Sequence, residues 1–219
     1  MGLGSKRPDG PLFRVGRNDD AWAPPDWAYA QEDGTFGNRF DDPEAHYRVV
    51  YACSRRLGCY VETLARFRVD LSFVAELEQM EDDEEDDFSA FGTLNRSWFA
   101  QRCIGTAEAF GDYADIYSLE WVSHLRSVLA STAMQLGMTD VDLSSLQRAE
   151  PRILTQRASR EAFENRFDGI FYHSRYGQTI ENWAIFEPFA IHDQKSESID
   201  EEDPELAEAM KILGLVFVD

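Results

Sequence analysis

The segment from residue 47 to residue 67, YRVVYACSRRLGCYVETLARF, changes its pattern of apolar residues halfway along. Its first part, residues 47–52, is rich in valine and tyrosine and therefore predicts a strand. Ser54 is then predicted to cap a helix, because apolar residues recur beyond it at helical spacing. These apolar residues are Leu57, Tyr60, Val61 and Leu64. A strand that runs straight into an amphipathic helix requires a fold in which helices cover a sheet.

The rest of the chain continues this mixture of strands and helices. Further strands are predicted at 12–15, 102–110, 168–174 and 182–191, and helices at 70–80, 115–137 and 151–165. In helix 115–137, the side chains expected to face inward are Ile116, Leu119, Val122, Leu125 and Leu129. A short C-terminal helix is expected after Asp203 as its cap, with Pro204 at its first position and Gly214 just past its end. Because the elements do not alternate as regular βαβ units, the pattern indicates an α+β fold.

At 219 residues, the chain is long enough for one sizeable core and is expected to form a single domain. We expect a loose N-terminal tail at 1–11, the folded domain at 12–190, and an acidic linker with the C-terminal helix at 191–219.

The net charge of −20 argues against unaided binding to nucleic acid or to anionic membranes, since both require clustered Lys and Arg. Much of the negative charge lies in two blocks, EDDEEDD at 81–87 and SESIDEEDPE at 196–205. Both are expected to be solvated loops, because a solid acidic block lacks the spacing of a calcium loop. What else these blocks do is left open by the sequence.

Cys53, Cys59 and Cys103 form no CxxC pair and are odd in number, which indicates neither a disulfide framework nor a zinc site. They are expected to be small buried hydrophobic residues in a reducing compartment. The first ten residues lack the apolar region of a signal peptide, and no stretch reaches transmembrane length. We therefore expect a cytoplasmic protein.

Common catalytic motifs are missing from the sequence. It contains neither GxGxxG nor GxxxxGK[ST], and HExxH and GxSxG are absent too. The histidines are scattered without metal-ligand spacing, so no metal is expected. The remaining candidates are polar residues at strand ends and in glycine-bearing turns: Arg14, GNRF at 37–40, Tyr51, Glu62 and YHSRYG at 172–177.

Each of these candidates has an ordinary alternative. Glu62 and Arg66 could form a surface ion pair at i, i+4, contributing about 0.3–0.5 kcal/mol. Tyr51 could be a core residue, Arg39 could close a turn, and Ser174 could end a strand by bonding its own backbone.

Glu62 also has small helical neighbours. Gly58, Cys59 and Ala65 lie three or four positions away, which leaves room for a ligand beside the carboxylate.

Taken together and in order, the candidates resemble the RES domain, a family named for an Arg, a Glu and a Ser. The motifs that carry the resemblance are Arg14, a GxRF-type turn (Gly37, Arg39, Phe40), YRVVYACSRRLGCYVETLA with Tyr51 and Glu62, and FDGIFYHSRYGQTIENWAIFEP with Ser174. The resemblance spans about residues 12–190. It implies an ADP-ribosyltransferase-like split β-sheet core with surrounding helices, and an enzyme that consumes NAD. Many members are toxins that pair with an Xre-type antitoxin protein.

The resemblance also implies a role for each matched residue. Arg14 would hold the ribose or phosphate on the nicotinamide side, and Arg39 would clamp the pyrophosphate. Tyr51 would stack on the nicotinamide ring, and Ser174 would bond the nicotinamide mononucleotide half. Glu62 would accept from the ribose hydroxyls and stabilise the cationic sugar. The turn here continues as RFDDPEA, where two aspartates would repel the phosphates unless they turn outward.

A single carboxylate suits cleavage of the nicotinamide–ribose bond. Nicotinamide leaves as a neutral molecule, so the reaction needs little acid catalysis and chiefly requires stabilisation of an oxocarbenium-like sugar. The implied reaction passes ADP-ribose from NAD to water or phosphate. The alternatives are ADP-ribosylation of a protein and a non-catalytic acidic module that recruits a basic partner. A homodimer is the common default for the oligomeric state.

Overall fold

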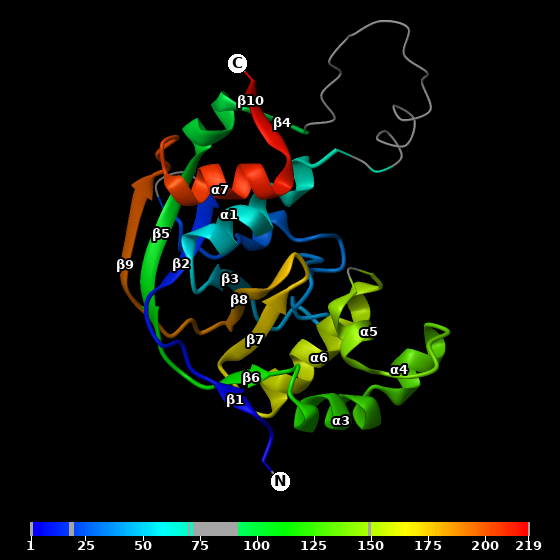
Figure 1. Ribbon diagram of the computed structural model, residues 1–219. Coiled ribbons are helices and arrows are strands. Elements are labelled where there is room, and N and C mark those ends of the chain that lie inside the picture. Colours follow the sequence, from blue (N-terminus) through cyan, green and yellow to red (C-terminus); the bar gives the residue numbers. More distant parts are fainter. Residues whose placement is uncertain (1, 18–19, 70, 72–91, 149, 219) are drawn as a thin grey trace, which may run out of the picture.

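The computed structural model describes residues 2–17, 20–69, 71, 92–148 and 150–218 (Figure 1). Apart from residue 71, the helix predicted at 70–80 lies outside the described residues, as does the acidic block at 81–87. None of the helices that can be described has the length and apolar character needed to cross a bilayer.

Strands in the described part of the chain form one large mixed sheet and one small sheet. The eight strands of the large sheet lie in the order β1 (Ser5–Lys6), β6 (Tyr113–Asp115), β7 (Gly169–Ser174), β8 (Gly177–Phe186), β3 (Val49–Cys53), β2 (Leu12–Arg17), β5 (Arg102–Ala109) and β9 (Ile191–Ser198). The β6–β7 pair is parallel, and the other neighbours are antiparallel. The small sheet is the parallel pair of β4 (Gly92–Asn95) and β10 (Leu215–Val218).

The helices form two groups around the large sheet (Figure 1). One group consists of α1 (Arg56–Leu64) and α7 (Pro204–Leu213), which pack on each other. The other contains α3 (Leu119–Val128), α4 (Ala130–Gln135), α5 (Leu143–Gln147) and α6 (Arg152–Glu164). Short 3-10 helices occur at η1 (Trp27–Tyr29), η2 (Ala65–Phe67) and η3 (Arg96–Gln101).

Strand alternation divides the core between the two faces of the sheet. In β3, Val49 packs with the group α3–α6, whereas its neighbour Val50 packs on the opposite face. In β8, Ala184 and Ile185 divide in the same way. Because consecutive strand residues point to opposite faces, Tyr51 lies on the face of Val49. The predicted mixed fold class is therefore confirmed.

The predicted strand and helix around residues 47–67 are confirmed, but Ser54 is not the helix cap. Its hydroxyl donates to the carboxylate of Glu181 at 3.1 Å and accepts from the indole of Trp183 at 2.9 Å. Both partners belong to β8, so the Ser54 side chain is engaged by the neighbouring strand. Arg55 occupies the N-cap position instead, without a side-chain capping bond.

The helix predicted at 115–137 is two helices, α3 and α4, that meet at Leu129. The side chain of Ser118 accepts a hydrogen bond from the backbone N–H of Trp121, so α3 begins at Leu119 and not at residue 115 as predicted. Leu119, predicted to face inward, is consequently 81% exposed at the first helical position, while Trp121 is fully buried. Ile116, Leu125 and Leu129 are buried as predicted.

Segments near both ends of the described chain pair with strands of the large sheet, where a loose tail and a linker were predicted. Ser5 and Lys6, expected in a loose tail, pair with β6. The segment 191–198, expected in a linker, is β9 and pairs with β5, although its side chains beyond Ile191 are exposed. The C-terminal helix is as predicted: Asp203 caps α7, and Gly214 ends it with a left-handed backbone at φ 63°.

Candidate active site

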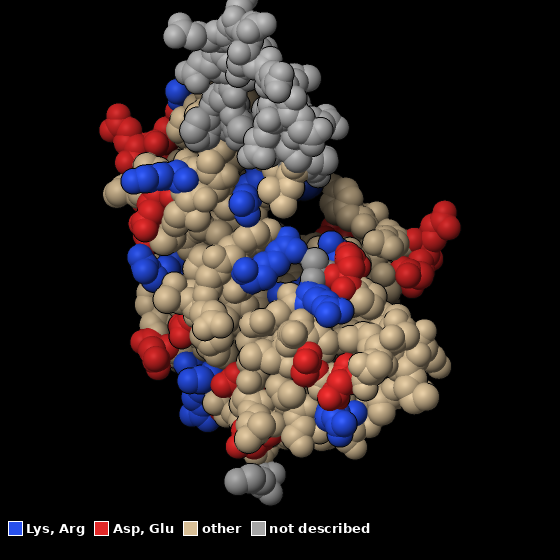
Figure 2. Space-filling view, turned by 45° about the vertical axis from the view of Figure 1, so that its right-hand side comes forward, with Lys and Arg blue, Asp and Glu red and all other residues tan. Residues whose placement is uncertain are grey.

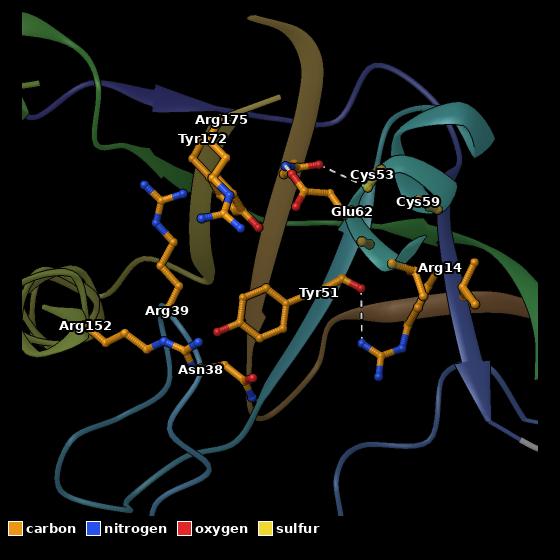
Figure 3. Close-up of a pocket in the computed structure, with 14 residues that line it drawn as sticks. Arg14, Asn38, Arg39, Tyr51, Cys53, Cys59, Glu62, Arg152, Tyr172 and Arg175 are labelled. Atoms are coloured by element: carbon orange, nitrogen blue, oxygen red, sulfur yellow. Dashed lines mark hydrogen bonds between the residues drawn. The ribbon is translucent and has the colours of Figure 1, made fainter. Parts of the chain in front are cut away.

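A cavity of about 410 Å³ opens between α1, the turn at residues 38–39, and the strands β3, β7 and β8 (Figure 3). Four of the predicted site residues border it together. Its lining consists of Arg14, Val15, Asn38, Arg39, Tyr51, Ala52, Cys53, Cys59, Glu62, Thr63, Arg152, Tyr172, Arg175 and Asn182. The volume lies within the range of roughly 300–1,000 Å³ that is typical of small-molecule sites.

Strand register sets the floor of the cavity. Asn182 of β8 lies directly opposite Cys53 of β3 on one side and Tyr172 of β7 on the other. Residues that are paired in this way point to the same face of the sheet. Tyr51 stands on the same face, two residues before Cys53, because side chains alternate along a strand. Three neighbouring strands therefore present their polar and aromatic side chains in adjacent rows.

Helix α1 follows β3 after two residues and lies directly over this floor. Gly58 makes the close approach possible, since a Cβ there would be 2.9 Å from a methyl carbon of Ile180 and 3.2 Å from the Cβ of Cys53. The interpretation that the small residues beside Glu62 leave room for a ligand is therefore wrong for Gly58, whose space is filled by the sheet. Cys59 does border the cavity.

Glu62 is half-buried and borders the cavity. Its Oε1 accepts a hydrogen bond of 2.7 Å from the side-chain amide of Asn182, whose Oδ1 accepts from the thiol of Cys53 at 3.0 Å. The guanidinium of Arg66, the alternative ion-pair partner, instead lies over the ring of Phe67, 4.9 Å from its centre. The carboxylate is thus held by the sheet.

Arg14 of β2 closes one side of the cavity and ties two backbone segments together. Its guanidinium donates to the carbonyl of Ala21 at 2.7 Å. It also donates to the carbonyl of Tyr51 at 3.1 Å (Figure 3). Ala21 can come this close because Gly16 has no side chain: a Cβ there would be 2.3 Å from the Cα of Ala21. Burial lowers the pKa of the Arg14 guanidinium below its usual range.

Tyr51 is fixed in the cavity through its hydroxyl, which donates to Oδ1 of Asp41 at 2.8 Å and accepts from the backbone N–H of Phe40 at 2.9 Å. Burial raises the pKa of Tyr51 well above its usual range, so the hydroxyl stays neutral. Since both roles of the hydroxyl are taken, the ring is the part of Tyr51 that can serve a ligand.

The two aspartates in the turn after Arg39, which would repel phosphates unless they turn outward, are buried within the loop. Asp41 is 3% exposed and accepts from the backbone N–H of Asn38 at 2.7 Å, in addition to the hydroxyl of Tyr51. Asp42 is 2% exposed and accepts from the backbone N–H of His46 at 2.6 Å. Both carboxylates order the loop that carries Arg39. Burial raises the pKa of Asp41 above its usual value.

The raised pKa of Asp41 predicts a pH-dependent contribution to stability. Because the native state binds this proton more tightly than the unfolded chain, the contribution is fully present below the unfolded pKa. It is lost as pH rises through the raised native pKa. From about pH 4 to about pH 7, the unfolding free energy of wild type should therefore fall relative to that of Asp41→Asn. Urea denaturation at both pH values measures this, with the exposed Asp9→Asn as control. A wild-type-to-variant difference that is independent of pH would contradict the prediction.

Arg39 projects from the turn at residues 37–40, where Gly37 has a φ of 71°. Its Nη2 donates to the hydroxyl of Tyr117 at 3.0 Å and to the carbonyl of Leu146. Its Nε is buried and has no partner among the described residues. A buried donor without a partner is costly, so a ligand oxygen would stabilise it.

The cavity is positively charged although the chain is strongly negative. Its described lining contains four arginines and one glutamate, in a chain of net charge −20. In Figure 3, Arg39, Arg152 and Arg175 lie on one side of the Tyr51 ring and Arg14 on the other. Basic side chains also gather around a hollow in the middle of the face that Figure 2 shows. Such a site suits a ligand with several phosphate charges.

Ser174 is the predicted site residue that lies apart from the others. It is 3% exposed, does not belong to the lining, and its hydroxyl accepts from the backbone N–H of Tyr176 at 3.0 Å. Its neighbours Tyr172 and Arg175 border the cavity instead.

Sequence reasoning missed several lining residues. Asn182 was detectable as an amide at the start of an apolar strand, in the sequence NWAIF. Arg175 lies within the candidate motif YHSRYG but was given no role of its own, and Arg152 carried no signal, because an arginine on a helix is ordinary.

Comparison with known proteins agrees with this geometry. The profile of the RES domain matches residues 11–206. Among solved structures, a chain of the M. tuberculosis MbcT–MbcA toxin–antitoxin complex matches with 11% sequence identity and a TM-score of 0.51, covering 95% of this chain and 91% of that chain. At this identity the match shows a shared fold, which confirms the predicted ADP-ribosyltransferase-like class. No curated protein gave a significant match. Because the profile covers nearly the whole chain, the protein belongs to the RES domain family.

Proposed function

We propose that this protein cleaves the bond between nicotinamide and ribose in NAD and passes ADP-ribose to water or phosphate. The observation that carries the proposal is the cavity itself, in which one oriented carboxylate, Glu62, stands among four arginines. Membership of the RES family supports it, since RES toxins in general act on NAD. We further propose a toxin role, an Xre-type antitoxin partner and a cytoplasmic location.

In the proposed reaction, Glu62 stabilises the positive charge that develops on the sugar as nicotinamide leaves. Its orientation is fixed in advance by Asn182, so no reorganisation is needed when the charge appears. Accepting hydrogen bonds from the ribose hydroxyls would bring the carboxylate close to the reacting carbon. The leaving group needs no proton, which is why a site with a single carboxylate is sufficient.

The proposed roles of the other residues depend on which of their atoms are already hydrogen-bonded within the protein and which remain available to a ligand. Tyr51 offers its ring face to the nicotinamide, because its hydroxyl is occupied. Arg14, anchored by two carbonyls, lies near the nicotinamide-side ribose and its phosphate. Arg39 clamps the pyrophosphate. The role implied for Ser174, a hydrogen bond to the nicotinamide mononucleotide half, stays a prediction, since its hydroxyl accepts from the backbone of Tyr176 and lies outside the lining.

Arg39→Lys should raise the KM for NAD roughly 10- to 100-fold with a smaller change in kcat, the scale of a lost charge-assisted hydrogen bond. A guanidinium can give two parallel bonds to a pyrophosphate, whereas an ammonium acts as a point charge. Steady-state kinetics on Arg39→Lys, beside the exposed Arg126→Lys as control, measures the effect. An unchanged KM would remove Arg39 from the proposed phosphate clamp.

The direct test is NAD turnover by the purified protein, with and without phosphate. Release of nicotinamide would support the glycosyl chemistry, and dependence on phosphate would choose the acceptor. If NAD remains intact, with candidate protein acceptors present as well, the proposal fails and a non-catalytic binding role replaces it.

Transfer to a protein acceptor is less well supported. A transferase requires a residue that activates the acceptor, and Tyr60 occupies the position two residues before Glu62. Tyr60 is fully buried, and its hydroxyl donates to Asp203 at 2.9 Å. It therefore points into the contact with α7 rather than into the cavity. A mass shift on a target protein would favour the transferase.

A further inference from the structure

We propose that Asn182 and Cys53 are positioning residues for Glu62, acting as a hydrogen-bonded chain from thiol to amide to carboxylate. The inference rests on the proposed function of Glu62 and extends it. None of the sequence motifs assigned a role to either residue. Both act through Glu62 and are assigned no contact with the reacting atoms.

The chain is short and its members are rigidly placed. The Cys53 thiol donates to Oδ1 of Asn182 at 3.0 Å, and the Asn182 amide donates to Oε1 of Glu62 at 2.7 Å. Asn182 is 1% exposed and Cys53 is 5% exposed. The two residues are also directly paired in the register of β3 and β8, in the middle of the large sheet. Their backbones are therefore fixed next to each other, and burial leaves their side chains little room.

The carboxylate of Glu62 and the thiol of Cys53 together favour one orientation of the Asn182 amide. A side-chain amide has one accepting and one donating end, and a carboxylate can only accept. If the oxygen of Asn182 pointed at Glu62, two acceptors would face each other and repel. The donation from Cys53 holds the oxygen on the far side, so the NH₂ group faces Glu62. A side-chain hydrogen bond with the neighbouring Cys59, together with burial, raises the pKa of Cys53 well above its usual range, which keeps the thiol protonated.

Glu62 therefore has a fixed orientation in which its two carboxylate oxygens have different partners. Oε1 is occupied by Asn182, and we assign Oε2 to the sugar. An unsupported carboxylate beside an open cavity would sample several rotamers. A carboxylate that is already oriented stabilises developing charge without first having to be ordered.

The test compares two pairs of variants in NAD turnover. Asn182→Ala should lower kcat roughly 10- to 100-fold while the KM for NAD changes less than about threefold, because the lost bond orients Glu62 and does not bind substrate. Asn182→Asp keeps the shape but places a second carboxylate against Glu62, so its kcat should be lower still. A purely structural role predicts that both variants lose thermal stability while the kcat of the folded protein stays near that of wild type.

The second pair tests the thiol. Cys53→Ser retains a donor and should keep kcat within about threefold of wild type, whereas Cys53→Ala should lower it roughly 5- to 10-fold, the scale of one neutral hydrogen bond. Thermal denaturation of each variant separates loss of folding from loss of orientation. If Asn182→Ala does not fold, the cysteine pair still decides the question.

The outcomes separate this inference from the proposed function. Wild-type turnover that depends on Glu62, combined with a wild-type kcat in Asn182→Ala, would overturn the positioning role and leave the function standing. Equal kcat values in Cys53→Ala and Cys53→Ser would remove the thiol from the chain. No turnover by wild type would overturn both proposals.

Discussion

Replacing Glu62 by glutamine is expected to lower the kcat of NAD cleavage by roughly 10²- to 10³-fold, equivalent to about 3–4 kcal/mol of barrier. Glutamine has nearly the same shape, and its oxygen can still accept from Asn182. The variant therefore removes the negative charge and leaves the packing of α1 in place. Nicotinamide release under saturating NAD measures the effect.

Two controls make this result interpretable. Glu208→Gln is the same substitution at an exposed position of α7 and should leave turnover unchanged. The thermal transition of Glu62→Gln should lie close to that of wild type, because no buried volume is lost. If Glu62→Gln retained most of the activity, the carboxylate would not be the group that stabilises the sugar.

Trp121→Ala is expected to lower the free energy of unfolding by about 3–5 kcal/mol, the usual range for removing a large buried aromatic side chain. Trp121 is fully buried, and its ring lies against Phe167, with 5.3 Å between ring centres. Its indole N–H donates to the carbonyl of Gly4 at 2.8 Å, which ties the N-terminal segment to α3. The variant would lose this packing and also strip the carbonyl of its donor. Chemical denaturation gives the value.

Two further variants provide reference values for the loss of unfolding free energy in Trp121→Ala. Trp121→Phe keeps much of the ring but not the N–H, so its loss should be smaller. Leu119→Ala, two residues away and 81% exposed, should change stability by less than about 0.5 kcal/mol. If Trp121→Ala were as stable as Leu119→Ala, the N-terminal segment and α3 would not be part of the cooperative core.

Local patterns predicted the fold best where the controlling contacts are local. The caps of α7 were readable because Asp203, Pro204 and Gly214 act within their own turn. Ser54 was misassigned because its hydroxyl bonds to β8, more than a hundred residues later in the chain. Leu119 was misplaced because one capping contact of Ser118 shifted the start of the helix. The spacing of apolar residues along a helix reveals neither long-range side-chain bonds nor capping contacts.

The residues of the candidate site also fall into two groups, those that local motifs identified and those that long-range contacts place there. Arg14, Arg39, Tyr51 and Glu62 were named from short motifs in a recognisable order, and the structure brings all four to one cavity. The partner of Glu62 was not predicted, because only strand register places Asn182 opposite Cys53 and beneath α1. The same limit applies to Asp41 and Asp42, whose inward turn depends on backbone N–H groups in the loop they order.

The contact between Glu62 and Asn182 joins residues that are 120 positions apart in the chain. During translation, Glu62 and the site residues before it are synthesised well before β8, which carries Asn182. Such long-range pairings form late, because the intervening chain must first be closed into a loop. A nascent chain therefore carries the carboxylate without the amide that orients it. The contact between Glu62 and Asn182 can form only after β8 has been synthesised, so a chain that stops before Asn182 lacks it.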